Sequence, residues 1–137
     1  MTVTAEMRRY VIERASNCCE YCLLSQIDNL FRFHIEHIIA EKHDGKDELD
    51  NLAWSCLNCN AFKGSDIGSL DPKTGLLTPL FNPRTQVWHE HFQLNGALIE
   101  PLIPDGRVTV KLLQMNRLEQ LIERTGLIEL GRYPCNR

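Results

Sequence analysis

The chain has 137 residues, 43% of them hydrophobic, which is enough for one domain with a hydrophobic core and a small appendage. Its formal net charge of −3 argues against a broad basic surface, so any contact with nucleic acid must come from a local positive patch. The sequence has no apolar run of about 18 residues and no signal-peptide pattern at its start, so we expect a cytoplasmic protein that does not span a membrane.

The N-terminal half is predicted to combine two helices with two short strands. Residues 4–15 are predicted to form a helix, because apolar side chains recur there at helical spacing. A strand rich in β-branched and aromatic residues is predicted over 33–39, and a polar loop with a glycine turn signal over 41–51. A second short strand is predicted over 52–56, and a helix begins within 56–64.

The C-terminal half shows three kinds of pattern. Residues 65–87 are rich in Gly, Pro, Ser and Asp and are predicted to be irregular. Residues 88–103 alternate apolar and polar side chains on both sides of the Asn-Gly pair at 95–96, which predicts a β-hairpin. Residues 109–130 have a helical pattern with a break near Asn116.

Four cysteines form two knuckles of the form C-x-x-C, Cys19 with Cys22 and Cys56 with Cys59. A two-residue spacer lets a tight turn direct both sulfurs at one ion, and four thiolates suit a closed tetrahedral zinc site. We therefore predict one structural zinc that staples the region before the first strand to the start of the following helix. The alternative is a set of free, buried thiols that pack as small hydrophobic side chains.

Two further cysteines have no evident partner in the sequence. Cys18 can replace Cys19 in the first knuckle only with a longer spacer, so Cys19 is preferred as the ligand. Cys135 lies in a C-terminal tail and is predicted to have no role. In the expected cytoplasmic setting, metal ligation is favoured over disulfide formation.

Polar residues interrupt the apolar frame of the first predicted strand. His34, Glu36 and His37 lie within it, and Asn51 and Asn60 follow at intervals. The run IEHIIAEKHDGKDELDNLAWSCLNCNAFKG, with its acidic-His pair, middle Asn and CxxCNxxK motif, resembles the HNH endonucleases.

This resemblance covers roughly residues 8–64 and implies the ββα-metal fold. The expected fold class is therefore α+β, with an N-terminal helix and a small HNH core stapled by zinc within residues 1–64. Residues 65–137 are then a C-terminal extension of irregular chain, a β-hairpin and helices, packed on that core.

By position in the motif, the resemblance implies a role for five residues. His37 resembles the general base, and Glu36 and Asn60 resemble the ligands of one catalytic Mg²⁺ or Mn²⁺ ion. Asn51 resembles the residue that fixes the loop and orients His37, and Lys63 is placed to meet a DNA phosphate. These residue types suit the chemistry, because imidazole accepts protons near neutral pH and hard divalent ions prefer oxygen ligands.

The implied function is a metal-dependent DNA endonuclease that hydrolyses phosphodiester bonds by a one-metal mechanism and leaves 5′-phosphate and 3′-hydroxyl ends. DNA is then the partner, and a homodimer would suit a two-strand cut of a symmetric site. The alternative is a non-catalytic zinc-knuckle module that binds nucleic acid or protein. The Glu36–His37 pair favours catalysis, because a binding module has no need of it.

Two expectations concern the direction of the histidine side chains. Adjacent residues of a regular strand point to opposite faces, so Glu36 and His37 reach one site only if the strand ends or bends there. His34 is expected to be a partly exposed histidine rather than a neighbour of the metal ligands. In the stretch WHEHF over 88–92, we expect the aromatic rings on the core and both histidines outward.

Overall fold

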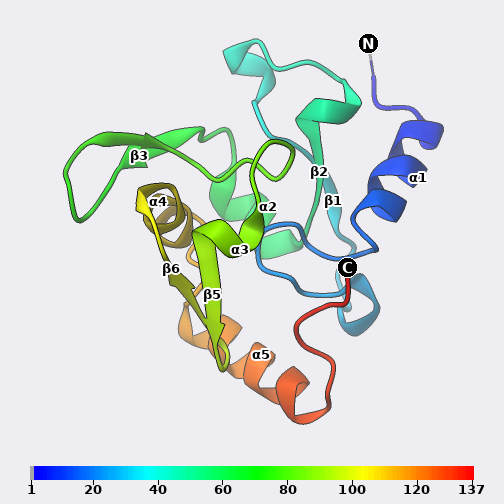
Figure 1. Ribbon diagram of the computed structural model, residues 1–137. Helices are drawn as coiled ribbons and strands as arrows, with labels where there is room; N and C mark the ends of the chain where they lie inside the picture. The colour runs from blue at the N-terminus through cyan, green and yellow to red at the C-terminus, as the bar shows by residue number, and fades with distance from the viewer. Residues whose placement is uncertain (1) are drawn as a thin grey trace.

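The computed structural model describes residues 2–137 and is shown in Figure 1. Its helices and strands are α1 (Ala5–Arg14), β1 (His34–His37), β2 (Leu52–Ser55), α2 (Leu57–Lys63), β3 (Gly68–Leu70), β4 (Leu77–Pro79), α3 (Trp88–His91), β5 (Phe92–Asn95), β6 (Leu98–Pro101), α4 (Pro104–Leu112) and α5 (Leu118–Glu129). Short 3₁₀ turns lie at Gln26–Asp28, Glu41–His43 and Leu49–Asn51. Within the described residues the strands pair as three separate antiparallel hairpins, so the fold is the expected mixture of α and β.

Helix α1 forms where the apolar spacing predicted it. Thr4 precedes the helix, and its hydroxyl accepts a hydrogen bond from the backbone N–H of Met7 at 3.1 Å, which satisfies one of the free donors of the first turn. Val11 is the fully buried residue of this helix. The predicted range of 4–15 is therefore confirmed to within one residue at each end.

Strands β1 and β2 form an antiparallel hairpin that leads directly into α2. Glu36 pairs with Ala53, and His37, the last residue of β1, pairs with Leu52. All four residues of β2 are buried, which explains its apolar composition. Both predicted strands and the predicted helix are confirmed, and β1 ends at the residue where the sequence required it to end or bend.

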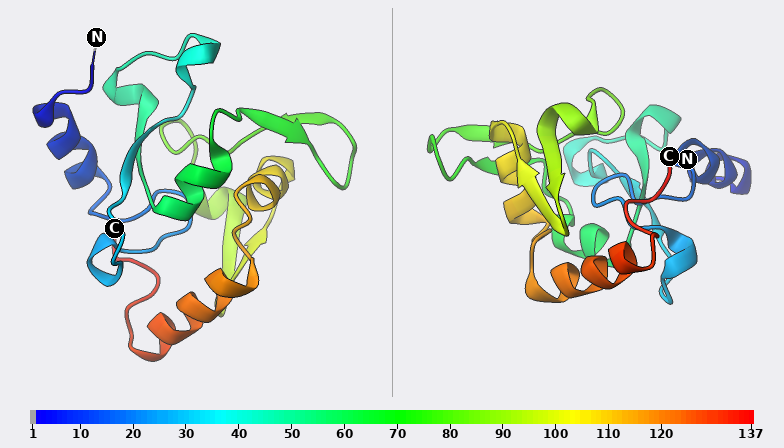
Figure 2. Two further views of the ribbon diagram at one scale, coloured as in Figure 1. Left: turned by 180° about the vertical axis from the view of Figure 1, so that it is seen from behind. Right: turned by 60° about the horizontal axis from the view of Figure 1, so that its bottom comes forward.

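The prediction that residues 65–87 are irregular is wrong for two segments, which form the hairpin β3–β4. Gly68 pairs with Pro79, and Leu70 pairs with Leu77. A two-stranded ribbon has two free edges, so proline is tolerated where the missing N–H faces outward. A Cβ at Gly68 would lie 2.7 Å from the carbonyl oxygen of Thr78, so the close approach of the strands requires glycine. This hairpin projects from the body of the molecule in Figures 1 and 2.

The hairpin predicted around residues 95–96 is confirmed as β5–β6, but its first part is not a strand. Residues 88–91 form the short helix α3, which places both Trp88 and His91 in the core. The ring of His91 is buried, with Nδ1 2.8 Å from the carbonyl oxygen of Val87, so the expectation that both histidines face outward is wrong for His91. His89 is exposed, as expected.

The helical pattern of residues 109–130 is confirmed, with an earlier start, as α4 and α5. The break between them lies at Asn116, whose side chain bonds both the backbone N–H and the carbonyl of Ile99, at 2.9 and 2.8 Å. The same amide oxygen accepts a hydrogen bond from the buried Arg124. The break therefore places Asn116 where its side chain can hydrogen-bond the backbone N–H and carbonyl at the free edge of β6.

One hydrophobic cluster contains residues from both halves of the chain. Buried polar contacts join the halves as well: Trp88 Nε1 donates to the carbonyl of Tyr21 at 2.8 Å, and the Tyr133 hydroxyl donates to the carbonyl of Cys22 at 2.7 Å. Figures 1 and 2 show the C-terminal tail returning to the end of α1. Over the described residues, no helix has the length and apolar character needed to cross a membrane.

Candidate functional site

The four knuckle cysteines meet in one buried cluster. The sulfur atoms of Cys19, Cys22, Cys56 and Cys59 all lie within 4.8 Å of one another. A tetrahedral ion with Zn–S bonds of about 2.3 Å requires sulfurs about 3.8 Å apart, and the Sγ atoms of Cys22 and Cys56 are 3.6 Å apart. The cluster therefore has the dimensions and the ligand chemistry of a structural zinc site.

Each knuckle is shaped by a backbone hydrogen bond to sulfur. The N–H of Cys22 donates to Sγ of Cys19 at 3.5 Å, and the N–H of Cys59 donates to Sγ of Cys56 at 3.4 Å. Cys56 is also the residue that caps the start of α2. The cluster thus joins the turn after α1 to the N-terminus of α2 and holds the hairpin β1–β2 between them.

A disulfide joins Cys18 to Cys135, so the prediction that Cys135 has no role is wrong. Their Cα atoms are 5.8 Å apart across a sequence separation of 117 residues. The backbone N–H of Cys135 also donates to the carbonyl of Leu23 at 2.9 Å. The disulfide pins the C-terminal tail beside the first knuckle, and it leaves Cys19, as preferred, in the cluster.

Glu36 lies on the buried face of β1 and is only 4% exposed. One of its oxygens, Oε2, accepts a hydrogen bond from the Tyr21 hydroxyl at 2.7 Å, and Oε1 forms an ion pair with Nζ of Lys63. Burial raises the pKa of Glu36 above its usual value, while Lys63 and Tyr21 oppose that shift. Tyr21 sits between the two cysteines of the first knuckle, so the cysteine cluster helps to position the Glu36 carboxylate.

Lys63 does not reach the surface, which corrects its predicted contact with a DNA phosphate. It is 1% exposed, and besides Glu36 its ammonium donates to the carbonyls of Ile38 and His37 at 2.9 and 3.3 Å. The last turn of α2 packs over the end of β1, so the same helical face that carries Asn60 turns Lys63 inward. Lys63 therefore ties α2 to β1.

His37 is held by a carboxylate that the sequence interpretation assigned to a solvated loop. Its Nε2 is 2.5 Å from Oδ1 of Asp47, and its side chain is 32% exposed. A charged hydrogen bond of this kind fixes the ring plane and the tautomer. The only signal for Asp47 in the sequence was its place in the loop that returns from one strand of the hairpin to the other.

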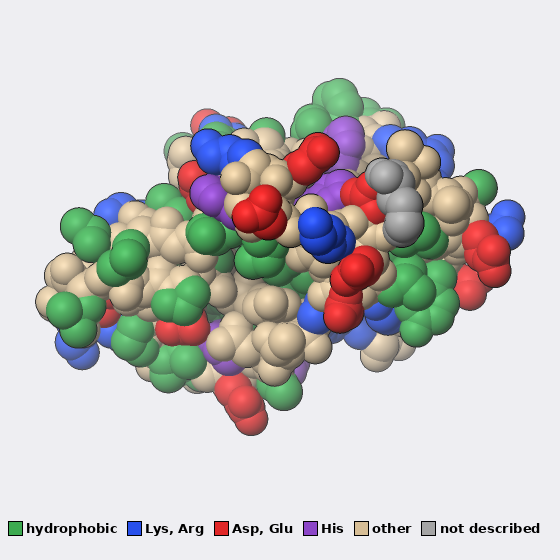
Figure 3. All heavy atoms as spheres, turned by 90° about the horizontal axis from the view of Figure 1, so that it is seen from above, with side chains coloured by type: hydrophobic (Ala, Val, Ile, Leu, Met, Phe, Trp, Pro, Cys, Tyr) green, Lys and Arg blue, Asp and Glu red, His purple; other side chains and the backbone are tan. Residues whose placement is uncertain are grey.

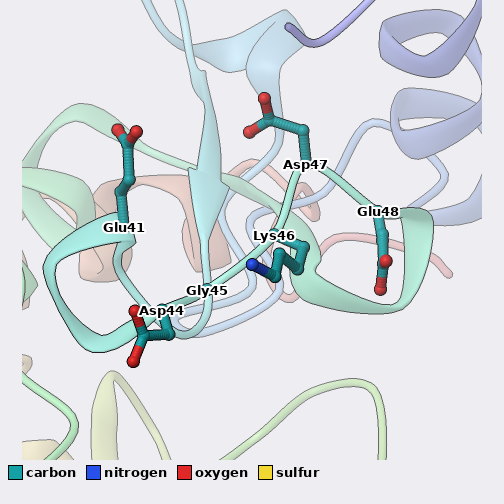
Figure 4. Close-up of a pocket in the computed structure, with 6 residues that line it drawn as sticks. All are labelled: Glu41, Asp44, Gly45, Lys46, Asp47 and Glu48. Atoms are coloured by element: carbon teal, nitrogen blue, oxygen red, sulfur yellow. The ribbon is translucent and has the colours of Figure 1, made fainter. Parts of the chain in front are cut away.

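Asn51 closes that loop through backbone contacts. Its amide nitrogen donates to the carbonyls of Ile39 and Lys46 at 3.0 and 2.9 Å, and its amide oxygen accepts from the N–H of Ile39 at 2.9 Å. Lys46 directly precedes Asp47. Asn51 thus holds the backbone beside Asp47, and its predicted effect on His37 would act through that residue. In Figure 4 the carboxylates of Asp47 and Glu41 project to the same side of the loop, on the surface that is lined by Glu41, Asp44, Gly45, Lys46, Asp47 and Glu48.

The structure brings three of the predicted site residues to one small pocket. Glu36, His37 and Asn60 line it, together with Glu41, around a volume of about 240 Å³. His37 and Glu36 reach it from adjacent positions because β1 ends there. His34 is exposed, as expected. Histidine and acidic side chains lie close together on the face of the molecule shown in Figure 3.

Comparisons with known proteins agree with this geometry. Residues 19–66 match the model of the HNH endonuclease family. Among curated proteins, the chain is similar to the Septu protein PtuB of Bacillus thuringiensis, with 24% identity over 119 residues, which cover 82% of this chain and 42% of that protein. The chain thus spans less than half the length of this relative, and no solved structure gives a significant match. Residues 19–66, which contain the four-cysteine cluster and the pocket around Glu36, His37 and Asn60, therefore form an HNH endonuclease family domain.

Proposed function

We propose that this protein is a metal-dependent DNA endonuclease that hydrolyses phosphodiester bonds with His37 as the general base. The observation that carries the proposal is the Asp47–His37 hydrogen bond of 2.5 Å at a pocket that also contains Glu36 and Asn60. The alternative, a non-catalytic zinc-knuckle module, gives no reason to hold a partly exposed histidine with a carboxylate beside a second, buried carboxylate.

The four-cysteine cluster supports a structural zinc ion as the first cofactor. All four ligands are buried, which suits a closed site that contributes folding energy rather than chemistry. The zinc would act on catalysis only indirectly, because it holds the segment that carries Tyr21 against Glu36.

The pocket supports a second, more weakly held divalent ion with Glu36 and Asn60 as ligands. Each carboxylate oxygen has two lone pairs, so an oxygen that accepts one hydrogen bond from Tyr21 or Lys63 retains a site for a cation. Asn60 lines the same pocket, and its amide oxygen would be the second hard ligand. When bound, Mg²⁺ or Mn²⁺ supplies Lewis-acid stabilisation of the negative charge on the phosphate.

The hydrogen bond to Asp47 supports Nδ1 of His37 as the nitrogen that accepts the proton. In the neutral ring, Nε2 carries the hydrogen that it donates to Asp47, so Nδ1 holds the free lone pair. This nitrogen takes a proton from a water molecule, whose oxygen then attacks phosphorus while the bond from phosphorus to the 3′ oxygen breaks. The 3′ oxygen leaves with a proton from solvent, which gives 5′-phosphate and 3′-hydroxyl ends. Asp47 stabilises the imidazolium that forms on His37.

Cleavage of supercoiled plasmid, with and without Mg²⁺ or Mn²⁺, tests the proposal. His37→Ala should slow cleavage by about 10²–10⁴-fold, the usual contribution of a positioned general base. His34→Ala is the matched control, because His34 is an exposed histidine on the same strand. Wild-type protein that contains zinc and binds DNA but never cuts it would favour the binding module instead.

A further inference from the structure

A second pocket, away from His37, is lined by an excess of positive charge. Three arginines, Arg14, Arg84 and Arg137, line it with a single acidic side chain, Glu20, around a volume of about 470 Å³. They come from the end of α1, the segment after β4 and the C-terminal tail, and Figures 1 and 2 show the tail beside the end of α1. We refer to this site as the arginine pocket.

The one acidic side chain of the arginine pocket is already engaged. Oε1 of Glu20 pairs with Nη2 of Arg84, and Oε2 accepts a hydrogen bond from the backbone N–H of Trp54 at 2.8 Å. Burial lowers the pKa of Arg14, and Tyr10 and Asp50, outside the pocket, oppose that shift only in part. The side chains that line the pocket therefore sum to a net positive charge.

Several guanidinium nitrogens in the pocket are also unpaired. Arg14 donates from Nη1 to the carbonyl of Leu49 and from Nη2 to that of Leu52, at 2.9 and 2.7 Å. Among the described residues, Nε of Arg14 and both Nε and Nη1 of Arg84 have no hydrogen-bond partner, although all three are shielded from solvent. Buried donors without partners are uncommon in folded proteins, and they point to a missing acceptor.

The positive charges of Arg14 and Arg84 repel each other in this shielded pocket. Burial, followed by the positive charge of Arg14, lowers the pKa of Arg84 to about 10, which leaves it charged at neutral pH. An anion in the pocket would relieve this repulsion through space, because shielded charges are weakly screened by water. Arg137 is exposed and lines the same pocket, so it is accessible to an anion bound there. Guanidinium groups match the oxygens of phosphate especially well.

We propose that the arginine pocket binds a backbone phosphate of the nucleic-acid substrate. This inference rests on the proposed nuclease function and adds the local positive patch that a chain of net charge −3 requires. Arg14 links the pocket to the carbonyl of Leu49, the first residue of the turn that carries Asn51, and to that of Leu52, which directly follows the turn. A phosphate held there is thus attached to the same loop that positions Asp47. The Cys18–Cys135 disulfide anchors the tail that supplies Arg137.

The test measures DNA binding separately from cleavage. In a His37→Ala background, binding of a short DNA duplex is followed by fluorescence anisotropy across a series of salt concentrations. Arg137→Gln should make the slope of log K against log salt less steep by about 0.9, the change for one lost phosphate contact. Arg9→Gln, an exposed arginine of α1 outside the pocket, should leave the slope unchanged. Arg137 is preferred to Arg84 as the test, because loss of Arg84 would leave the buried Glu20 unpaired.

A second arm uses inorganic phosphate against chloride at equal ionic strength and follows thermal unfolding. Stabilisation of the wild type by phosphate, reduced by Arg137→Gln, together with the slope change, supports the proposal. Equal slopes for the Arg137 and Arg9 variants refute it. Stabilisation by phosphate with an unchanged DNA slope assigns the pocket to a small phosphate ligand and overturns the nucleic-acid assignment. An inactive wild type that shows the Arg137-dependent slope refutes nuclease chemistry but retains the pocket.

Discussion

The Lys63→Met variant, which lacks the ammonium group, tests whether Lys63 stabilises the fold, as its contacts indicate, or binds DNA. Lys63 is 1% exposed and Glu36 is 4% exposed, so water screens their ion pair very little. In Lys63→Met, Glu36 would remain in the core without its positive partner. Breaking a buried pair in this way costs about 3–5 kcal/mol. That loss is a large fraction of the stability of a domain, which is about 5–15 kcal/mol.

The assay is urea unfolding followed by circular dichroism, with zinc held constant. Glu36→Gln combined with Lys63→Met removes both charges and keeps the side-chain volumes, so the double variant should recover most of the lost free energy of unfolding. The cycle should give a coupling energy of about 2–3 kcal/mol. Lys42→Met, which changes an exposed lysine of the loop, should shift the free energy of unfolding by less than about 0.5 kcal/mol.

One outcome would contradict the buried ion pair between Lys63 and Glu36. A Lys63→Met variant as stable as Lys42→Met, but with weakened DNA binding and a shallower salt slope, would show that Lys63 reaches a phosphate. The burial of Lys63 against Glu36, and with it the attachment of α2 to β1, would then be refuted.

Further outcomes follow from the other contacts. Asp47→Asn should slow cleavage by about 10- to 150-fold, since a charge-assisted hydrogen bond contributes about 1.5–3 kcal/mol, and zinc content and circular dichroism should not change. Cys56→Ser should lose both the zinc and the fold, as elemental analysis and circular dichroism would show against one zinc per chain in the wild type. Mild chelation should stop cleavage while zinc and fold persist, and added Mn²⁺ should restore it; cleavage that persists in protein stripped of every metal but zinc would contradict a second ion. Arg107 holds the pKa of Asp71 well below its usual value through two hydrogen bonds of 2.8 Å. The stability from Asp71 is therefore present above the unfolded pKa of about 3.9 and lost as pH falls below it, so thermal unfolding of wild type and Asp71→Asn should converge at low pH.

The sequence alone determined the elements whose causes are local. Apolar spacing and the cap at Thr4 placed α1, and the Asn-Gly pair at 95–96 placed the hairpin β5–β6. The two C-x-x-C knuckles and the run from Glu36 to Asn60 identified the four-cysteine cluster and the HNH segment. Short-range hydrogen bonds, turn chemistry and ligand spacing depend on neighbouring residues, so they can be read along the chain.

The tertiary structure decided which charged groups meet. Asp47 and Lys63 both have the character of solvated residues in the sequence, because charged side chains are rarely buried without a partner. Whether a partner is present depends on how α2 and the loop fold back on β1, and on a tail that returns over a separation of 117 residues to join Cys18 to Cys135. The arginine pocket likewise exists only because three distant segments converge. Electrostatic energies depend on distance and burial in space, which spacing along the chain does not specify.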